Sequence, residues 1–74
     1  MTPPKNTEHV TAYMVGSPEG VARDAYVDGP SPDCLELIQY MEEGQILVGK
    51  RADGSVVFRE QLVNKALVPW NPLT

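Results

Sequence analysis

The chain has little of what usually reinforces a small protein. It contains a single cysteine, Cys34, among 74 residues, so no intrachain disulfide can form, and the paired Cys or His spacing of a structural zinc site is missing. A domain near this size buries only about 60% of the surface that its unfolded chain exposes. The free energy of unfolding of folded proteins is roughly 0.05–0.15 kcal/mol per residue, so the total stability of this chain is small. We therefore expect one small core in a reducing compartment, stabilised by packing, by self-association or by a partner.

Long hydrophobic runs are also missing. The first residues, MTPPKNT, lack the apolar stretch of a signal peptide, and no run approaches the length that spans a membrane. The sequence predicts a cytoplasmic protein that makes no membrane contact.

Positive charge is scarce and unevenly distributed. Six Lys and Arg stand against ten Asp and Glu, for a formal charge of −4. Residues 1–44 hold eight of the acids and two of the bases, whereas residues 45–74 hold two acids and four bases. Binding to a phosphate backbone requires clustered Lys and Arg, so direct nucleic-acid binding is not expected. An acidic surface suits steering towards a basic protein patch, although it is more often a solubility feature.

The region around which the rest is organised is residues 45–60. Two runs rich in β-branched residues flank Asp53-Gly54, which is a strong hairpin signal. The predicted register places Gly49 opposite Phe58 and Lys50 opposite Val57, with the aromatic ring covering the glycine. One face then carries Leu47, Gly49, Val56 and Phe58 as the core face. The other carries Ile46, Val48, Val57, Lys50 and Arg59, and is either covered by a helix or offered to a partner.

The remaining segments predict further strands and helices, and the fold class is α+β. Alternating β-formers predict a strand over residues 9–15 beside the hairpin. Ser17-Pro18-Glu19 predicts a short helix near 18–26. Ser31-Pro32-Asp33 repeats this start signal before a stronger periodic run, which predicts a helix near 32–43 that ends at Gly44. A strand over 34–40 is the competing interpretation. Residues 61–68 fit either a short helix or an extension of the last strand.

Together these elements predict a single α+β domain over residues 9–68. Its small antiparallel sheet, made of strand 9–15 and hairpin 45–60, packs against the helix near 32–43. A disordered lead-in at 1–8 and a C-terminal tail at 69–74 flank the domain and give flexible termini. Trp70 lies between two prolines in that tail, where it either packs on the domain or docks on a partner.

No residue pattern points to catalysis or to a bound cofactor or metal. His9 and Cys34 are alone of their kinds, and no nucleophile signature surrounds either of them. Glu42-Glu43 is more typical of solvated charge than of an acid–base pair, and Asp53-Gly54-Ser55 lacks the spaced acids of a calcium loop. We expect a protein that is not an enzyme and needs no cofactor.

The compact chain as a whole, from KNTEHVTAYM at residues 5–14 through GKRADGS at 49–55 to VPWNP at 68–72, resembles very small phage-encoded regulators that bind host RNA polymerase, of the type made by a Xanthomonas-infecting phage. The resemblance implies a polymerase-binding protein that inhibits transcription initiation from host promoters, with read-through of terminators (antitermination) as a further activity. It carries no portable contact motif, so no family contact residue is transferred to this chain.

Residue type alone suggests where a protein partner would bind, because aromatic residues and Arg dominate interaction hot spots. The expected assembly state is a monomer or weak dimer. The alternative function is a structural or assembly protein that self-associates through an apolar sheet face. The partner-binding candidates are Tyr13, Tyr40, Lys50, Arg51, Arg59 and Trp70.

Overall fold

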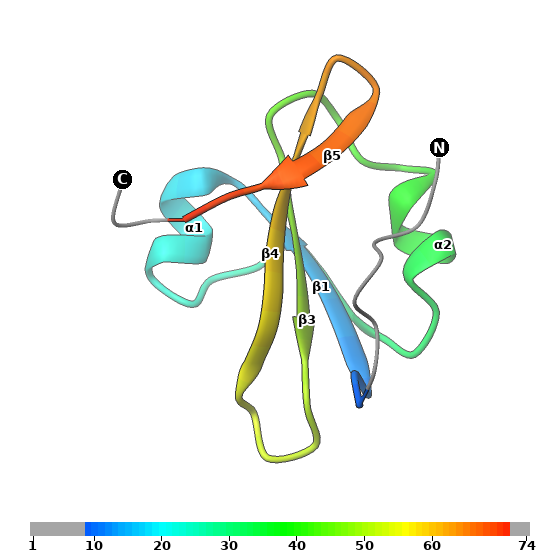
Figure 1. The fold of residues 1–74 in the computed structure, drawn as a ribbon, viewed down its shortest axis with the longest axis vertical. Helices are drawn as coiled ribbons and strands as arrows, with labels where there is room; N and C mark the ends of the chain where they lie inside the picture. The colour runs from blue at the N-terminus through cyan, green and yellow to red at the C-terminus, as the bar shows by residue number, and fades with distance from the viewer. Residues whose placement is uncertain (1–8, 72–74) are drawn as a thin grey trace.

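The computed structural model describes residues 9–71 and shows an α+β domain built on one antiparallel sheet (Figure 1). The strands lie in the order β2-β1-β3-β4-β5. The predicted lead-in at 1–8 lies outside the described residues, as do positions 72–74. The elements along the chain are β1 (Ala12–Gly16), α1 (Pro18–Ala22), β2 (Asp28–Ser31), α2 (Cys34–Ile38), β3 (Ile46–Lys50), β4 (Val56–Val63) and β5 (Ala66–Pro69).

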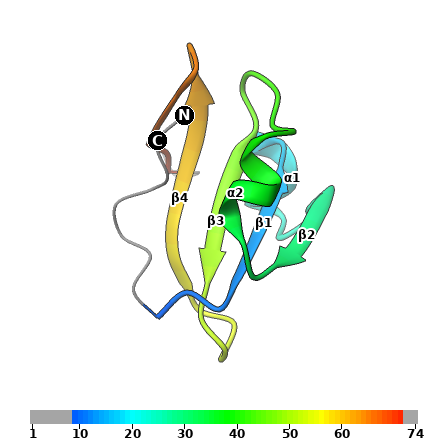
Figure 2. The same ribbon diagram turned by 90° about the vertical axis from the view of Figure 1, so that its right-hand side faces the viewer.

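The two helices cover opposite faces of the sheet. Figure 2 shows α2 in front of the strands and α1 behind them. Under α2 lies the larger cluster, which we call the α2-side core, and under α1 lies the smaller α1-side core. The α2-side core contains the buried residues Tyr13, Val15, Cys34, Ile38 and Leu47. The α1-side core contains Val21, Ile46 and Val48, with Tyr26, Val56 and Trp70 packed against them.

The hairpin predicted over 45–60 is confirmed as β3 and β4, with a correction to its register. Gly49 lies opposite Phe58 and Val48 opposite Arg59, as expected, but Lys50 pairs with Val56 instead of Val57. The turn spans three residues, since the Arg51 N–H donates to the Ser55 carbonyl at 2.9 Å. A bulge between Gly49 and Lys50 then adds one residue to β4 and restores the expected pairing. Val56 consequently packs in the α1-side core, and not on the face predicted for it.

Gly49 is required by its two aromatic neighbours. Tyr13 on β1 and Phe58 on β4 both pair with it, and their ring centroids lie 6.2 Å apart. A Cβ at Gly49 would collide with the Phe58 ring. The expectation that an aromatic side chain covers this glycine is therefore confirmed.

Both helices are shorter than predicted. In α1, Ser17 accepts a hydrogen bond from the Gly20 N–H at 3.0 Å and Pro18 opens the first turn, as the sequence indicated. The helix ends at Ala22 because Asp24 adopts a left-handed conformation (φ 58°). The Ala25 N–H donates to the Gly20 carbonyl and the Asp24 N–H to the Val21 carbonyl. This is the Schellman arrangement that terminates helices.

The second helix covers Cys34–Ile38 instead of 32–43, and the competing strand over 34–40 does not form. The helix starts two residues later than predicted, because Asp33, and not Ser31, caps it by accepting from the Leu35 N–H at 3.0 Å. After Ile38 the chain continues through tighter turns, with the Tyr40 N–H bonded to the Leu37 carbonyl. Adjacent glutamates at positions 42 and 43 oppose the helix dipole, and Gly44 (φ 89°) serves the turn into β3 instead of ending the helix.

Two strands were not predicted. Residues 28–31 read as a break, yet they form the edge strand β2 beside β1. Gly29 adopts φ 104°, and a Cβ there would contact the Tyr13 carbonyl, so glycine is required at this position. At the other edge, Val63 pairs with Ala66 across a tight turn in which Asn64 and Lys65 have φ 51° and 65°. The predicted extension of the last strand is therefore correct only for residues 61–63, which complete β4, whereas residues 66–69 turn back as the separate strand β5.

Candidate protein interface

The feature of the surface that stands out is a group of charged and aromatic side chains on the α1 side of the sheet. We call it the α1-side patch and define it by Asp24, Tyr26, Lys50, Arg59 and Trp70. Residues directly opposite in neighbouring strands share a face, so Arg59, which pairs with the buried Val48, points to the α1 side. Trp70 reaches the same side, where it packs on the α1-side core.

Local structure positions the acidic member of the patch. The Schellman turn that ends α1 holds Asp24 in its left-handed conformation. Its Oδ1 accepts a hydrogen bond from Lys50 Nζ at 2.8 Å and another from the Tyr26 hydroxyl at 2.6 Å. Lys50 Nζ also lies 5.0 Å from the centroid of the Tyr26 ring, within cation–π range. One lysine therefore connects the helix end, the following loop and β3.

These contacts shift the protonation equilibria of all three groups. Hydrogen bonding to Lys50 is the largest effect that lowers the pKa of Asp24 below its ordinary 3.8, with Tyr26 second. The same bond raises the pKa of Lys50 above 10.5. Burial, followed by the bond to Asp24, raises the pKa of Tyr26 above 10. At neutral pH the Asp24 carboxylate and the Lys50 ammonium are both charged and form an ion pair, and the Tyr26 phenol is protonated.

Arg59 is held differently from Lys50. Its Nε is buried and has no hydrogen-bond partner among the described residues. Within residues 9–71 its guanidinium forms no ion pair, although its charge contributes to lowering the pKa of Asp24. The backbone carbonyl of Arg59 is satisfied, because it accepts from the Trp70 N–H at 3.0 Å. The backbone of Arg59 is therefore adjacent to that of Trp70, and the Nε donor of its guanidinium is unsatisfied among residues 9–71.

The other sequence-based candidates are placed apart from this patch. Tyr13 is only 6% exposed and belongs to the α2-side core, so it is removed from the candidate surface. Tyr40, at 74% exposed, follows α2 on the opposite side of the sheet. Arg51 is exposed at the tip of the β3–β4 hairpin, where its Nη1 donates to Ser55 Oγ at 3.2 Å. Lys50, Arg59 and Trp70 are thus the candidates that the fold brings together.

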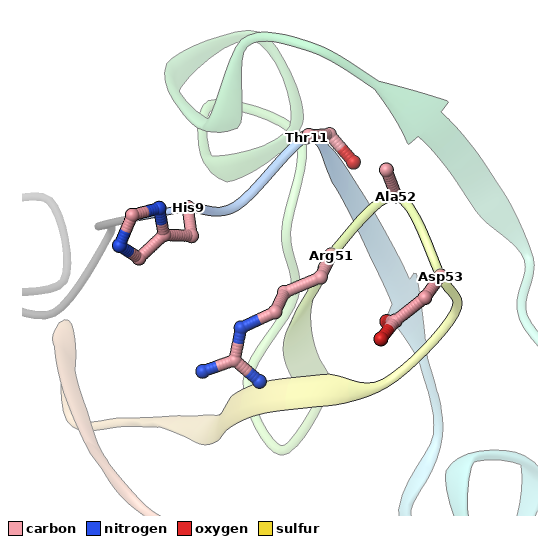
Figure 3. Close-up of a pocket in the computed structure, with 5 residues that line it drawn as sticks. All are labelled: His9, Thr11, Arg51, Ala52 and Asp53. Atoms are coloured by element: carbon pink, nitrogen blue, oxygen red, sulfur yellow. The ribbon is translucent and has the colours of Figure 1, made fainter.

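Arg51 also lines an open pocket of about 420 Å³ at the hairpin tip (Figure 3). The other lining residues are His9, Thr11, Ala52 and Asp53. In Figure 3 the Asp53 carboxylate points to the same side as the Arg51 guanidinium. Hydrogen bonds from Ser55 lower the pKa of Asp53, so the pocket is lined by a negative charge as well as by the positive charge of the arginine. The two charged side chains form their hydrogen bonds within the turn, to Ser55. The pocket therefore carries one positive and one negative charge and does not favour one class of ligand.

Sequence reasoning missed Asp24 and Tyr26 as members of the patch. Asp24 was interpreted as part of a continuous helix, and nothing in the local pattern distinguishes a helical from a left-handed aspartate. A signal was available in the short polar side chain, since Asp and Asn adopt the left-handed region more readily than most residues. Their pairing with Lys50, 26 positions away, has no local sequence signature.

The described residues contain no arrangement suited to metal binding, since no group of three His, Cys, Asp or Glu side chains comes together in residues 9–71. Cys34 is buried in the α2-side core, and burial raises the pKa of its thiol. No helix in that part of the chain is long and apolar enough to cross a membrane. The chain matches no known protein family, no curated protein and no solved structure.

Proposed function

We propose that the protein is a phage-encoded, non-enzymatic regulator that binds host bacterial RNA polymerase in the cytoplasm of the host cell. It inhibits transcription initiation from host promoters and promotes antitermination through protein contacts alone. It needs no cofactor, makes no direct contact with nucleic acid or membrane, and acts as a monomer or weak dimer. The whole-chain resemblance described above supports the choice of partner.

The single observation that carries a binding function is the α1-side patch. Half-buried aromatic and cationic residues gathered in one place have the composition of an interaction hot spot. A standard interface takes about 800 Å² from each partner, which is about a sixth of the 4801 Å² accessible surface of this chain. A patch that combines Lys50, Arg59 and Trp70 can form the centre of an interface of that size.

The alternative function, a structural or assembly protein that pairs through an apolar sheet face, has less support. Of the three apolar residues predicted for that face, Ile46 and Val48 are both 0% exposed. These two residues are therefore not available to a second copy of the chain. Sedimentation velocity over a wide concentration range tests this alternative, which requires a concentration-dependent dimer.

Two experiments with the purified chain test the proposal. Immobilised protein is expected to retain RNA polymerase from a lysate of the host bacterium, and purified polymerase is expected to bind directly. In a reconstituted reaction on a host promoter, addition of the protein is expected to reduce the yield of initiated transcripts. Failure of purified polymerase to bind, together with unchanged transcript yield, would remove the proposal.

A further inference from the structure

The α1-side patch carries more positive charge than it neutralises internally. It contains two cations, Lys50 and Arg59, and one anion, Asp24. Lys50 Nζ lies 2.8 Å from Asp24 Oδ1, and the exposed fraction of the Lys50 side chain is 15%. The carboxylate is therefore engaged by Lys50 and Tyr26, which leaves the Arg59 guanidinium as the cation whose charge is not paired within residues 9–71.

The hydrogen-bonding state of Arg59 points in the same direction. A guanidinium offers five N–H donors, and a buried donor without an acceptor is unfavourable. Arg59 Nε is such a donor. Because the side chain has no hydrogen-bond acceptor among residues 9–71, an incoming anionic group can bind its outer nitrogens without first breaking a hydrogen bond to that part of the chain. A carboxylate fits this role best, since its two oxygens match the planar fork of arginine.

The surroundings of Arg59 are apolar and suit a protein segment. Trp70 lies alongside, joined to Arg59 through the backbone. Val68 pairs with Gln61, which in turn pairs with the buried Ile46, so Val68 lies on this same face and is 39% exposed. A ligand that placed a carboxylate on Arg59 would therefore place neighbouring atoms over an indole ring and a valine.

We propose that the α1-side patch binds an acidic protein segment in which a glutamate or aspartate adjoins an apolar side chain, with Arg59 receiving the carboxylate and Trp70 and Val68 receiving the apolar group. The inference rests on the proposed function in one respect, because it names the kind of polymerase segment that would be bound. A patch of one net positive charge on a chain of net charge −4 favours a short acidic contact over a long polyanion, since a polyanion would be repelled by the acidic remainder.

The test uses the whole chain labelled with ¹⁵N, and an NMR titration with a hexapeptide that alternates glutamate and leucine. The Trp70 indole N–H and the Arg59 Nε–H report directly on the patch. Both signals are expected to shift with the acidic peptide and to shift far less with the matched peptide that alternates lysine and leucine. Added salt is expected to weaken the effect, because exposed charges are screened.

Variants sharpen the titration. Arg59→Glu is expected to weaken binding of the acidic peptide about tenfold or more, equivalent to a loss of about 1.4 kcal/mol. Arg59→Lys retains the positive charge but loses the planar guanidinium, so its affinity for the acidic peptide is expected to fall between those of the wild type and Arg59→Glu. Lys65→Glu, in the exposed β4–β5 turn, makes the same change of charge and is expected to alter affinity less than about twofold, as is typical of a charge away from the contact.

Several outcomes would overturn the inference. These are shifts confined to the hairpin-tip pocket, equal shifts with the lysine peptide, equal loss in Arg59→Glu and Lys65→Glu, or shifts with a single-stranded oligonucleotide but not with the peptide. The wild-type titration decides the matter even if Arg59→Glu fails to fold. Because no polymerase is present, failure here and failure of the proposed function are distinguishable.

Discussion

The two faces of the sheet are closed in different ways. On the α2 side, a helix covers a continuous core that includes the Tyr13–Phe58 pair. On the α1 side, a helix of the same length covers only part of the face, and Tyr26 and Trp70 pack beside it. The ion pair of Lys50 with Asp24 lies beside that second cover. One face is thus closed by a helix and serves stability, whereas the other is closed by amphipathic side chains that can also bind a partner.

The largest effect is expected from breaking the α2-side core. Leu47 is 0% exposed, and Leu→Ala in a core costs about 2–5 kcal/mol because the lost contacts leave a cavity. Leu47→Ala is expected to lower the free energy of unfolding by that amount in urea denaturation followed by circular dichroism. Leu35→Ala, at a helix position 51% exposed, is the control and should change stability by no more than about 0.5 kcal/mol. Equal losses in the two variants would contradict the assignment of the core.

A somewhat smaller effect is expected at the glycine between the two aromatic rings. Gly49→Ala places a methyl group against the Phe58 ring, and overpacking of this kind costs about 1–3 kcal/mol. The double variant Gly49→Ala, Phe58→Leu should lose less than the sum of the two single variants, because leucine makes room for the methyl group. Additive losses in thermal unfolding would show that the ring does not lie over Gly49.

Removing Trp70 tests the second face. Its side chain is only partly buried against the α1-side core, so Trp70→Ala is expected to cost about 1–3 kcal/mol, less than a fully buried aromatic residue. Amide hydrogen exchange should accelerate at Val48 and its neighbours on β4 more than around α2. Uniform acceleration on both sides would mean that the two cores do not respond separately.

The smallest effect is expected from the ion pair, and it depends on pH. The folded pKa of Asp24 is lowered, so its contribution to stability is present above the ordinary pKa of 3.8 and is lost as the pH falls through the folded value. Asp24→Asn should be slightly less stable than wild type at pH 7, and the two should converge in acid. Asn tolerates the left-handed conformation, so the helix end is preserved. A stability difference that persists at low pH would contradict this origin.

The alkaline limb offers a complementary check on the same pair. The folded pKa of Lys50 is raised above 10.5, so its contribution is complete below that pH and is lost as the pH rises through the folded value. Lys50→Met should therefore differ from wild type at neutral pH and approach it at strongly alkaline pH. Denaturation curves collected across that range measure the difference.

How far the sequence predicts this fold depends on how local each signal is. The β3–β4 hairpin and the start of α1 at Pro18 each depend on residues within a few positions of one another, and both predictions are confirmed. The helix predicted to begin near Pro32 also forms, but it begins at Cys34 with Asp33 as its cap. The β2 strand and the β4–β5 turn escaped prediction. Both depend on positive φ values, at Gly29, Asn64 and Lys65, and on pairing with a neighbouring strand. The local sequence pattern does not show which strand that neighbour is.

The candidate interface was predictable only as a set of residue types. Lys50, Arg59 and Trp70 were chosen because such residues dominate interfaces, and the fold places them on one face. Tyr13 was chosen for the same reason, yet it is buried, since its register opposite Gly49 directs it beneath α2. Composition cannot separate an aromatic residue that fills a core from one that borders a patch.

The sequence by itself determined that the chain forms a small α+β domain bent at Asp53-Gly54, with one helix starting at Pro18 and another starting near Pro32, because turns, caps and alternation act over a few residues. Only the tertiary structure decided that Asp24 meets Lys50 and that Arg59 lies beside Trp70 without an acidic partner among residues 9–71. Those contacts join residues far apart along the chain, and their geometry follows from strand register and from where α1 ends.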